Sequence, residues 1–314
     1  MFSSEQLKKF GIELWSYTEE VEACSYSEYA SWIAKGYAGG LNYLKDNRAL
    51  QRKNLRHVFP DFQSALVFLF PYGKSTPGTN GYHLADYVVG FGGQDYHQVL
   101  KKKLTELFHP IAKDENIKYQ IAIDILPILE RDLAYRSGLG WFGKNSLLIN
   151  KKLGSYFMIA SILMDKKFSF QETTTTLEVD HCGHCTACID ACPTKAILPN
   201  LRQIDASMCI SNFTIDLFHS DKIGPTGYAE SKEIFGCDIC QTVCPWNQKV
   251  ESGHDRELTE VENFFLNQPL DIVYAELSKM SKREFLRRFA STSLARTGRD
   301  GVMRNIELLL TSKE

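Results

Sequence analysis

One stretch of the sequence, between residues 182 and 244, decides how the rest of the chain is interpreted. Its first part reads Cys182-Gly-His-Cys185-Thr-Ala-Cys188-Ile-Asp-Ala-Cys192-Pro193, and its second part reads Cys237-Asp-Ile-Cys240-Gln-Thr-Val-Cys244-Pro245. A single further cysteine, Cys209, lies between them. The first part has the C-x2-C-x2-C-x3-C-P spacing that bacterial ferredoxins use to bind iron–sulfur clusters. The stretch therefore predicts a ferredoxin-like unit with two 4Fe-4S clusters.

In this spacing the cysteine before the proline binds the other cluster. The first cysteine set is therefore predicted as Cys182, Cys185, Cys188 and Cys244, and the second cysteine set as Cys192, Cys209, Cys237 and Cys240. A symmetric second run would have a cysteine at position 234, but the chain has Ile234 there, so Cys209 completes the second set. Two structural zinc sites stay open as an alternative, because four thiolates also suit zinc.

The composition is that of an ordinary soluble globular protein. The 314 residues suffice for more than one domain, and 44% are hydrophobic and 24% charged. No apolar run approaches the roughly 18 residues of a membrane span, and the N-terminus lacks an apolar core followed by a cleavage site. Because disulfide frameworks suit small secreted chains, we expect reduced thiols and a cytoplasmic protein. The ninth cysteine, Cys24, is expected to be a packed side chain.

The net charge of −2 is distributed unevenly. From Lys279 to the C-terminus there are nine Lys or Arg and four Asp or Glu, a balance of +5, which leaves a balance of −7 for the preceding 278 residues. A basic C-terminal segment on an acidic body indicates contact with a polyanion. A solvated helix face is the alternative that charge alone leaves open.

The predicted elements indicate an α+β fold in three parts. The first part, residues 1–170, is an α/β-layer domain with a helical start (1–50), strands at 65–72, 118–124 and 156–164, and helices at 95–108, with Asp95 as N-cap, and at 129–137. The ferredoxin-like unit follows over 171–256, beginning with a threonine-rich linker, and a short helical segment over 257–314. In that segment a helix at 283–289 is predicted to bury Phe285 and Phe289 with Leu286 beside them, before a turn at 297–301 and a helix from Met303.

A reaction site is expected in the first part, because roughly 180 residues precede the cysteines and an electron carrier alone needs few of them. The densest polar group is Asp124 with Glu130 and Arg131, followed by a glycine-rich loop that ends at Lys144-Asn145. A carboxylate at the end of an apolar strand can face a ligand crevice and donate a proton. Three alternatives stay open: Asp124 caps the next helix, Glu130 and Arg131 form a surface ion pair, and Lys144 is merely solvated.

Together these residues resemble the epoxyqueuosine reductases, a family that completes the queuosine modification of tRNA. The resemblance covers nearly the whole chain and rests on Asp95-Tyr96-His97, Asp124 with Glu130-Arg131, the loop from Gly138 to Asn145, the cysteines with the solitary Cys209, and Gly236-Cys-Asp-Ile-Cys-Gln-Thr-Val-Cys-Pro-Trp-Asn247. It implies a cobalamin, bound base-off without a protein histidine on cobalt, beside the two clusters. The implied reaction reduces the epoxide of epoxyqueuosine at the wobble position (34) of tRNA, with electrons passing through the clusters to cobalamin.

The resemblance also implies site residues. Asp124 matches the family's proton donor. The positions that match corrin contacts are Asp95, Tyr96, His97, Asp124, Lys144, Asn145, Leu148, Ile159, Leu201 and Cys209. Some members have a longer helical C-terminus than this chain, so the contacts with tRNA are expected from Lys222, Lys282, Arg283, Arg287, Arg296, Arg299 and Arg304. Residues 210–236, with Phe213, Phe218, Lys222 and Tyr228, are expected in a wall around the corrin and the tRNA loop.

Two other functions are compatible with the residues. One is a corrinoid iron–sulfur reductase of a small molecule, similar to the reductive dehalogenases, and the other is a ferredoxin-type electron carrier. The basic tail and the absence of a twin-arginine start favour tRNA over the first. For the leading function we expect a flavodoxin- or ferredoxin-like electron donor and a monomeric protein.

Overall fold

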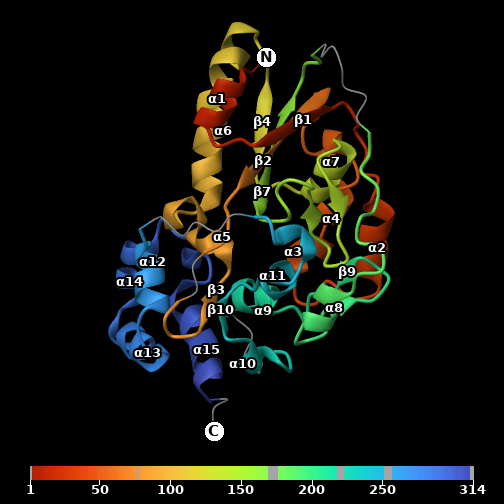
Figure 1. Cartoon of the computed structure of the whole chain (residues 1–314). Coiled ribbons are helices and arrows are strands. Elements are labelled where there is room, and N and C mark those ends of the chain that lie inside the picture. The colour runs from red at the N-terminus through yellow and green to blue at the C-terminus, as the bar shows by residue number, and fades with distance from the viewer. Residues whose placement is uncertain (1, 76–77, 169–175, 218–222, 251–256, 312–314) are drawn as a thin grey trace.

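The first part of the chain is built on an antiparallel sheet with strand order β1-β2-β7-β4 (Figure 1). The computed structural model describes residues 2–75, 78–168, 176–217, 223–250 and 257–311. The strands of this sheet are β1 (Leu14–Thr18), β2 (Ser64–Pro71), β4 (Tyr119–Ala122) and β7 (Phe157–Met164). The three strands predicted from apolar runs are confirmed. β1 lies where a helical start is predicted, because its pairing with the central strand β2 outweighs the local pattern.

Both faces of the sheet are covered by helices. Side chains alternate along a strand, so Leu66, Phe68 and Phe70 of β2 pack toward the long helix α6 (Tyr96–Asp114). Ala65, Val67 and Leu69 face the other way and pack with α7 (Glu130–Arg136). A continuous apolar run is what a strand buried on both faces requires, and each buried Val, Leu or Phe in it contributes roughly 1.5–3 kcal/mol. The fold is therefore mixed helix and sheet, as predicted.

Helix α6 begins where the sequence predicts. The Asp95 carboxylate accepts a hydrogen bond from the backbone N–H of His97 at 3.0 Å, which makes Asp95 the N-cap. The helix continues past the predicted end at Phe108, because Ala112 is buried on the same apolar face. The N-terminus of α6 thus places Asp95, Tyr96 and His97 near the end of β4.

The remaining elements of the first part are short. The glycine-rich loop folds into a hairpin of β5 (Trp141–Phe142) and β6 (Leu148–Ile149), in which Phe142 is opposite Leu148. The helices are α1 (Ser4–Lys9), α2 (Tyr26–Ala34), α3 (Asn42–Lys45), α4 (Arg48–Gln51), η1 (Leu55–His57), α5 (Asp86–Val89) and η2 (Gly90–Gly93).

The cysteine segment also consists of short elements. They are α8 (Ala187–Ala191), β8 (Ile197–Leu198), β9 (Gln203–Ile204), α9 (Ile210–Ile215), α10 (Tyr228–Ser231), β10 (Glu233–Phe235), α11 (Ile239–Thr242) and η3 (Pro245–Asn247). The two helices that carry cysteines, α8 and α11, pack against each other. This contact brings the two cysteine runs together.

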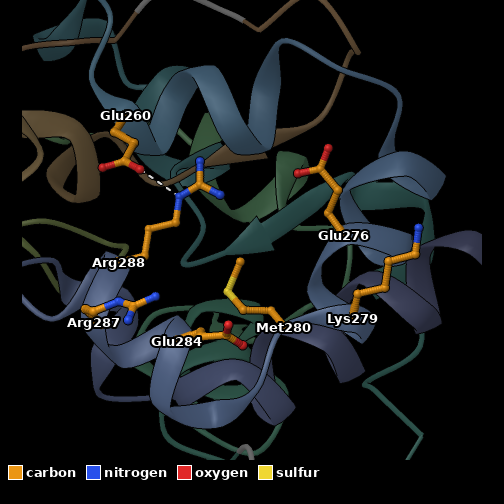
Figure 2. Close-up of a pocket in the computed structure, with 7 residues that line it drawn as sticks. All are labelled: Glu260, Glu276, Lys279, Met280, Glu284, Arg287 and Arg288. Atoms are coloured by element: carbon orange, nitrogen blue, oxygen red, sulfur yellow. Dashed lines mark hydrogen bonds and ion pairs between the residues drawn. The ribbon is translucent and has the colours of Figure 1, made fainter.

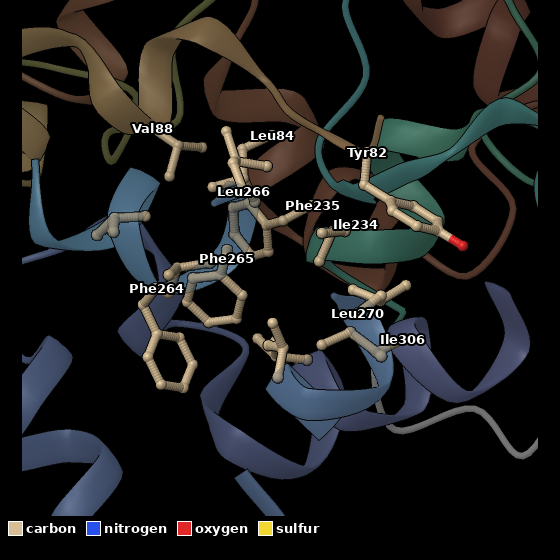
Figure 3. Close-up of a cluster of buried hydrophobic side chains, with 14 of the residues drawn as sticks. Tyr82, Leu84, Val88, Ile234, Phe235, Phe264, Phe265, Leu266, Leu270 and Ile306 are labelled. Carbon is tan, nitrogen blue, oxygen red and sulfur yellow. The ribbon is translucent and has the colours of Figure 1, made fainter. Parts of the chain in front are cut away.

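The C-terminal helices share a core with parts of both preceding segments (Figure 3). They are α12 (Glu260–Leu266), α13 (Leu270–Lys279), α14 (Lys282–Phe289), η4 (Ser293–Ala295) and α15 (Gly298–Thr311). Leu84 of β3 (His83–Leu84) and Phe235 of β10 are paired strand residues in this core, which also buries Phe265 and Ile306. Segments far apart in sequence are therefore joined by one apolar cluster.

Three expectations for these helices and the cysteine segment are wrong. Leu286 is 47% exposed, whereas Phe285 and Phe289 are fully buried, because Leu286 is turned about 100° from Phe285 around the helix and lies at the edge of the buried face. The predicted turn at 297–301 belongs mostly to α15, which begins at Gly298. Phe213 and Tyr228 do not form a wall around a site, because both are buried in the C-terminal core; Phe218 and Lys222 lie outside the described residues. In the described residues no helix has the length and apolarity to cross a bilayer.

Candidate functional site

The first cysteine set surrounds a cavity. Cys182, Cys185, Cys188 and Cys244 line a hollow of about 270 Å³, together with side chains from the β5–β6 hairpin and from η3. Cys188 is on α8, and Cys244 immediately precedes η3. The four predicted ligands of one cluster thus converge although 62 positions separate the first from the last.

The size of this cavity bears on the zinc alternative. Four cysteines around one zinc ion hold their sulfurs about 2.3 Å from the metal. Here the thiols are spread over the wall of a cavity, and within the described ranges no three His, Cys, Asp or Glu side chains converge on a single ion-sized site. The volume and the sulfur donors fit a polynuclear cluster.

The second cysteine set is also brought together. Burial raises the pKa of the Cys240 thiol, and the neighbouring charges of Cys209, Asp238, Cys188 and Cys192 raise it further. Burial likewise raises the pKa of Cys237, with Glu233, Cys240 and Cys209 adding to the rise. Buried thiols that disfavour each other's ionisation are stabilised as thiolates when iron supplies positive charge between them. The donor set therefore fits a second cluster.

The solitary Cys209 has a structural explanation. It is the N-cap residue of α9. Burial raises the pKa of its thiol, and the backbone N–H groups of Asn212 and Ser211 offset part of this rise. Ile234 is fully buried in β10, within the C-terminal core. The departure from a symmetric cysteine pattern thus follows from the place of β10 in that core.

Three carboxyl groups lie beside the second cysteine set: Glu233 is buried, and Asp86 and Asp238 are partly buried. The backbone N–H of Asp86 donates to Asp238 Oδ2 at 2.5 Å. Burial and the Asp86 charge raise the pKa of Asp238 to about 7. Burial, with the charges of Asp238 and Asp86, raises the pKa of Glu233 to about 9. This region therefore holds protons on carboxyl groups under conditions in which exposed carboxylates are ionised.

The motif that ends at Asn247 joins the cysteine segment to the residues just before β7. The Asn247 side chain is fully buried; its Oδ1 accepts from the backbone N–H of Ser155 at 2.7 Å, and its Nδ2 donates to Ser155 Oγ at 2.9 Å. Gln241 Oε1 accepts from Ser155 Oγ at 2.8 Å. Gly154 has a φ of +59°, and a Cβ there would lie 1.9 Å from Asn247 Oδ1, so only glycine fits.

The glycine-rich hairpin serves the first cysteine set. Lys144 Nζ donates to the backbone carbonyls of Gly183 at 2.7 Å and Cys185 at 2.8 Å, so it holds the loop between two cysteines rather than sitting in water. Asn145 is buried and lines the same cavity. Trp141 packs edge-on against Trp246, with ring centroids 5.0 Å apart. Lys144 and Asn145, predicted as corrin contacts, are thus placed beside the first cysteine set.

Asp124 is the centre of a second polar group. Tyr96, in the first turn of α6, donates its hydroxyl to Asp124 Oδ2 at 2.9 Å. The Tyr96 ring stacks on His97, with centroids 4.0 Å apart. His97 Nδ1 contacts Asp95 Oδ1 at 2.7 Å, and its Nε2 lies 3.5 Å from Arg296 Nη2. The predicted triplet Asp95-Tyr96-His97 is therefore joined to Asp124 by direct contacts.

The backbone at Asp124 is unusual and is held by Glu130. Asp124 has a φ of +54°, in the left-handed region, and its N–H donates to Glu130 Oε1 at 2.6 Å. Burial raises the pKa of Glu130 well above its usual range, and the Asp124 charge adds to the rise. Arg131 hydrogen-bonds to Ser146 instead of pairing with Glu130. The helix-cap alternative for Asp124 is wrong, because α7 begins at Glu130 with Leu129 as its cap residue.

Residues from four further segments reach this group, and the sequence singled out only one of them. Burial alone would lower the pKa of the Arg296 guanidinium, but Tyr96, Asp124 and Asp216 raise it. Burial, with the charges of Asp216 and Asp124, raises the pKa of Tyr43 to about 12. Tyr87 packs edge-on against Tyr96, with centroids 5.9 Å apart. Arg296 was predicted for tRNA, but no local signal marks Tyr43, Tyr87 or Asp216.

The other predicted corrin contacts are dispersed. Leu148 is buried in the core beneath the sheet, and Ile159 of β7 packs against the same core. Leu201 is 44% exposed. Cys209 belongs to the second cysteine set and is also close to Cys192.

The predicted tRNA contacts differ in whether their charged groups already have partners within the chain. Lys282 pairs with Asp300 at 2.6 Å, and Arg299 also contacts Asp300, at 3.0 Å. Arg304 donates to the carbonyls of Leu217 and Phe213, which explains it as a packing residue. Arg283 is exposed on α14, and Lys222 lies outside the described residues.

Arg287 lines an open pocket of about 740 Å³ among the C-terminal helices (Figure 2). Around it basic and acidic side chains alternate, and Arg288 pairs with Glu260 at 2.7 Å. The pocket therefore has mixed charge rather than a uniformly basic lining. Its other lining residues are Glu276, Lys279, Met280 and Glu284.

Known proteins match the chain both in the domain that contains Asp124 and in the cysteine segment. The family model described as "Epoxyqueuosine reductase QueG, DUF1730" matches residues 52–124, and that described as "4Fe-4S double cluster binding domain" matches residues 181–247. An epoxyqueuosine reductase of Leadbetterella byssophila is 35% identical over 96% of this chain and 97% of its own length. The chain belongs to the epoxyqueuosine reductase family.

Solved epoxyqueuosine reductases have the same fold. The Bacillus subtilis enzyme, crystallised with its catalytic aspartate loop swung out of the active site, has a TM-score of 0.79 at 25% identity, over 98% of this chain and 79% of its own. A second structure, an epoxyqueuosine reductase with an epoxyqueuosine-modified tRNA-Tyr stem loop, has a TM-score of 0.74 at 25% identity and similar coverage, 98% and 79%.

The residues near Asp124 fit the cobalamin that membership of the epoxyqueuosine reductase family implies. Both ring nitrogens of His97 are engaged, by Asp95 and Arg296, which suits a corrin without this histidine on cobalt. Beside Asp124, Ile125 is 71% exposed, and Tyr43 is 41% exposed. Large apolar side chains that face solvent next to a polar group are a surface that a corrin can cover.

Proposed function

We propose that this chain reduces the epoxide of epoxyqueuosine to give queuosine at position 34 of tRNA, the last step of queuosine biosynthesis. The observation that supports it best is the combination, in a member of this family, of two grouped cysteine sets with Asp124 held between Tyr96 and Glu130. Removing the epoxide oxygen as water takes two electrons and two protons. The cysteine sets serve the electrons, and the Asp124 group serves the protons.

Asp124 is the proposed proton donor to the leaving oxygen. The carboxyl pair Asp124–Glu130 suits this role, because burial and the adjacent charge raise the pKa of Glu130. A carboxyl group with a raised pKa keeps its proton to a higher pH than an exposed one, so Glu130 is suited to hold a proton next to Asp124. Glu130 also holds the backbone of Asp124, and Tyr96 orients its carboxylate. The related B. subtilis structure, whose catalytic aspartate loop is displaced, supports a loop position that matters for the reaction.

The cofactors are assigned to the chain as follows. We assign one 4Fe-4S cluster to each cysteine set and cobalamin to the surface between the start of α6, Asp124 and the cysteine segment. When bound, the clusters pass single electrons and cobalamin supplies a low-potential centre that reacts with the epoxide. The domain boundaries we propose are 1–170 for cobalamin and catalysis, 171–256 for the clusters, and 257–314 for the basic helical segment.

The substrate partner is proposed to be tRNA. A member of the family binds an epoxyqueuosine-modified stem loop, and the base must leave its stack to reach Asp124. Lys282, Arg283, Arg287 and Arg299 are the exposed or rim cations that we assign to the phosphates. Arg296, close to Asp124, is assigned to the flipped base instead. The protein is proposed to be cytoplasmic and monomeric, with a flavodoxin- or ferredoxin-like electron donor.

The experiment is a direct assay. Protein with reconstituted clusters is incubated anaerobically with cobalamin, a low-potential reductant and a stem loop that contains epoxyqueuosine. Nucleoside mass spectrometry is expected to show loss of one oxygen, and no conversion without cobalamin. An unchanged nucleoside, with both clusters and cobalamin bound, contradicts the proposed reaction.

A further inference from the structure

We propose that Asn145 donates a hydrogen bond to an inorganic sulfide of the cluster bound by the first cysteine set, and that this bond raises the reduction potential of that cluster. The inference rests on the proposed assignment of Cys182, Cys185, Cys188 and Cys244 to one cluster. Asn145 would then act on electron transfer through the potential of this cluster, and it is distinct from the proton-transferring group at Asp124.

The first observation is an unpartnered donor. Asn145 is only 5% exposed. Its Nδ2 is buried and has no acceptor among the described residues. A buried amide N–H group without an acceptor costs free energy, and native proteins seldom leave one so. An acceptor that belongs to a bound group resolves this cost.

The second observation is the direction of the amide. Asn145 Oδ1 accepts from the backbone N–H of Leu147 at 3.3 Å. A Cβ on Gly143 would lie 2.6 Å from the same Oδ1, so this oxygen is enclosed by the turn of the hairpin. The backbone N–H of Leu147 needs an acceptor in this turn, so the Asn145 side-chain atom placed there is the amide oxygen and not the nitrogen. Nδ2 therefore points away from the turn.

The third observation is the cavity itself. Asn145 lines the hollow of about 270 Å³ together with all four cysteines of the first set. None of the four sulfurs is a hydrogen-bond partner of Nδ2. An acceptor inside the hollow, between the cysteines, is what a cluster sulfide provides.

The effect on the potential follows from charge. A reduced cluster carries one more negative charge than an oxidised one, and a hydrogen bond to sulfur stabilises the more negative state. Cys185 is the one exposed thiol among the eight cluster cysteines. The first cysteine set thus reaches solvent at Cys185, and a cluster there that Asn145 makes easier to reduce suits an acceptor of electrons from an external donor.

The test compares Asn145→Ala with wild type and with Asn150→Ala. Asn150 is in the same hairpin, but its Nδ2 already donates to the carbonyl of Leu139 at 2.8 Å and it does not line the cavity. Iron and sulfide are counted, and the potentials of both clusters are measured by stepwise reduction followed by electron paramagnetic resonance. Asn145→Ala is expected to disfavour reduction of one cluster about tenfold, about 59 mV for one electron, with the other cluster and Asn150→Ala unchanged.

Unchanged potentials in Asn145→Ala with two clusters bound overturn the proposal. If this variant binds only one cluster, Asn145→Asp takes its place, because it keeps the acceptor for Leu147 and removes the donor. Its potential must fall at least as far, and an unchanged potential or loss of a cluster there also overturns the proposal. Fewer than two clusters in the wild type would instead contradict the proposed cysteine assignment.

Discussion

The cysteine segment and the surroundings of Asp124 are assembled over different distances in the sequence. All eight cluster cysteines lie between Cys182 and Cys244, and their order and spacing already group them in two sets. The group around Asp124 draws side chains from α3, α5, α6, α7 and the chain between η4 and α15. A binding site for a cluster can be specified by local spacing, whereas a site that protonates a substrate depends here on the whole fold.

The largest effect is expected from removing a cluster ligand. Cys237→Ala should lose one of the two clusters and all epoxide reduction, because no other thiol is available to its set. Cys24→Ala is the matched control, since the Cys24 thiol hydrogen-bonds to Asp132 at 3.1 Å and belongs to neither set. Iron content and turnover measure both variants. Two full clusters in Cys237→Ala would refute the assigned second set.

The C-terminal core positions Arg296 close to Asp124, because Arg296 follows helices that belong to this core. Phe285→Ala should lower the free energy of unfolding by about 3–5 kcal/mol, since Phe285 is fully buried. Leu286→Ala, one residue further on and 47% exposed, should change it by no more than about 0.5 kcal/mol. Denaturant unfolding measures both. Equal losses would show that the side chains of α14 are oriented differently.

Stability near the second cysteine set should depend on pH through Glu233. Its pKa is about 9 in the folded protein, against 4.5 as the ordinary value. Below pH 4.5 both states hold the proton and stability is unaffected; as pH rises toward 9 the unfolded state ionises first, so stability falls. Relative to Glu233→Gln, the wild type should lose about 1–3 kcal/mol between pH 6 and pH 8. Parallel pH profiles of the two proteins would contradict the buried, protonated Glu233.

A smaller effect is expected where Glu130 holds the Asp124 backbone. Glu130→Gln keeps an oxygen that can accept from the Asp124 N–H, but it removes the carboxyl group whose pKa burial raises. Turnover should fall about tenfold, roughly 1.4 kcal/mol in the barrier, with clusters and cobalamin retained. A single-turnover assay measures this rate. A rate equal to that of the wild type would exclude Glu130 from proton transfer.

Sequence patterns predicted most of what is local and little of what is assembled from a distance. The cysteine sets, the buried strand β2 and the N-cap Asp95 follow from spacing, periodicity and side-chain chemistry within a few residues. Tyr43, Tyr87 and Asp216 could not be found this way, because only tertiary packing brings them to Asp124. Leu286, placed beside Phe285 and Phe289, is more exposed than they are, and β1 was missed, for the same reason: neighbouring elements decide which residues are buried.

Proton donation by Asp124, separate from electron delivery by the cysteine segment, is the central claim. The most direct test follows two signals in Asp124→Asn, with Asp61→Asn as control, because Asp61 is an exposed carboxylate paired with Lys118. Reduction of bound cobalamin is followed by its visible spectrum, and formation of queuosine by mass spectrometry. We predict cobalamin reduction at the wild-type rate in both variants and queuosine formation at least about 100-fold slower in Asp124→Asn alone. Queuosine formation at the wild-type rate in Asp124→Asn would contradict the account.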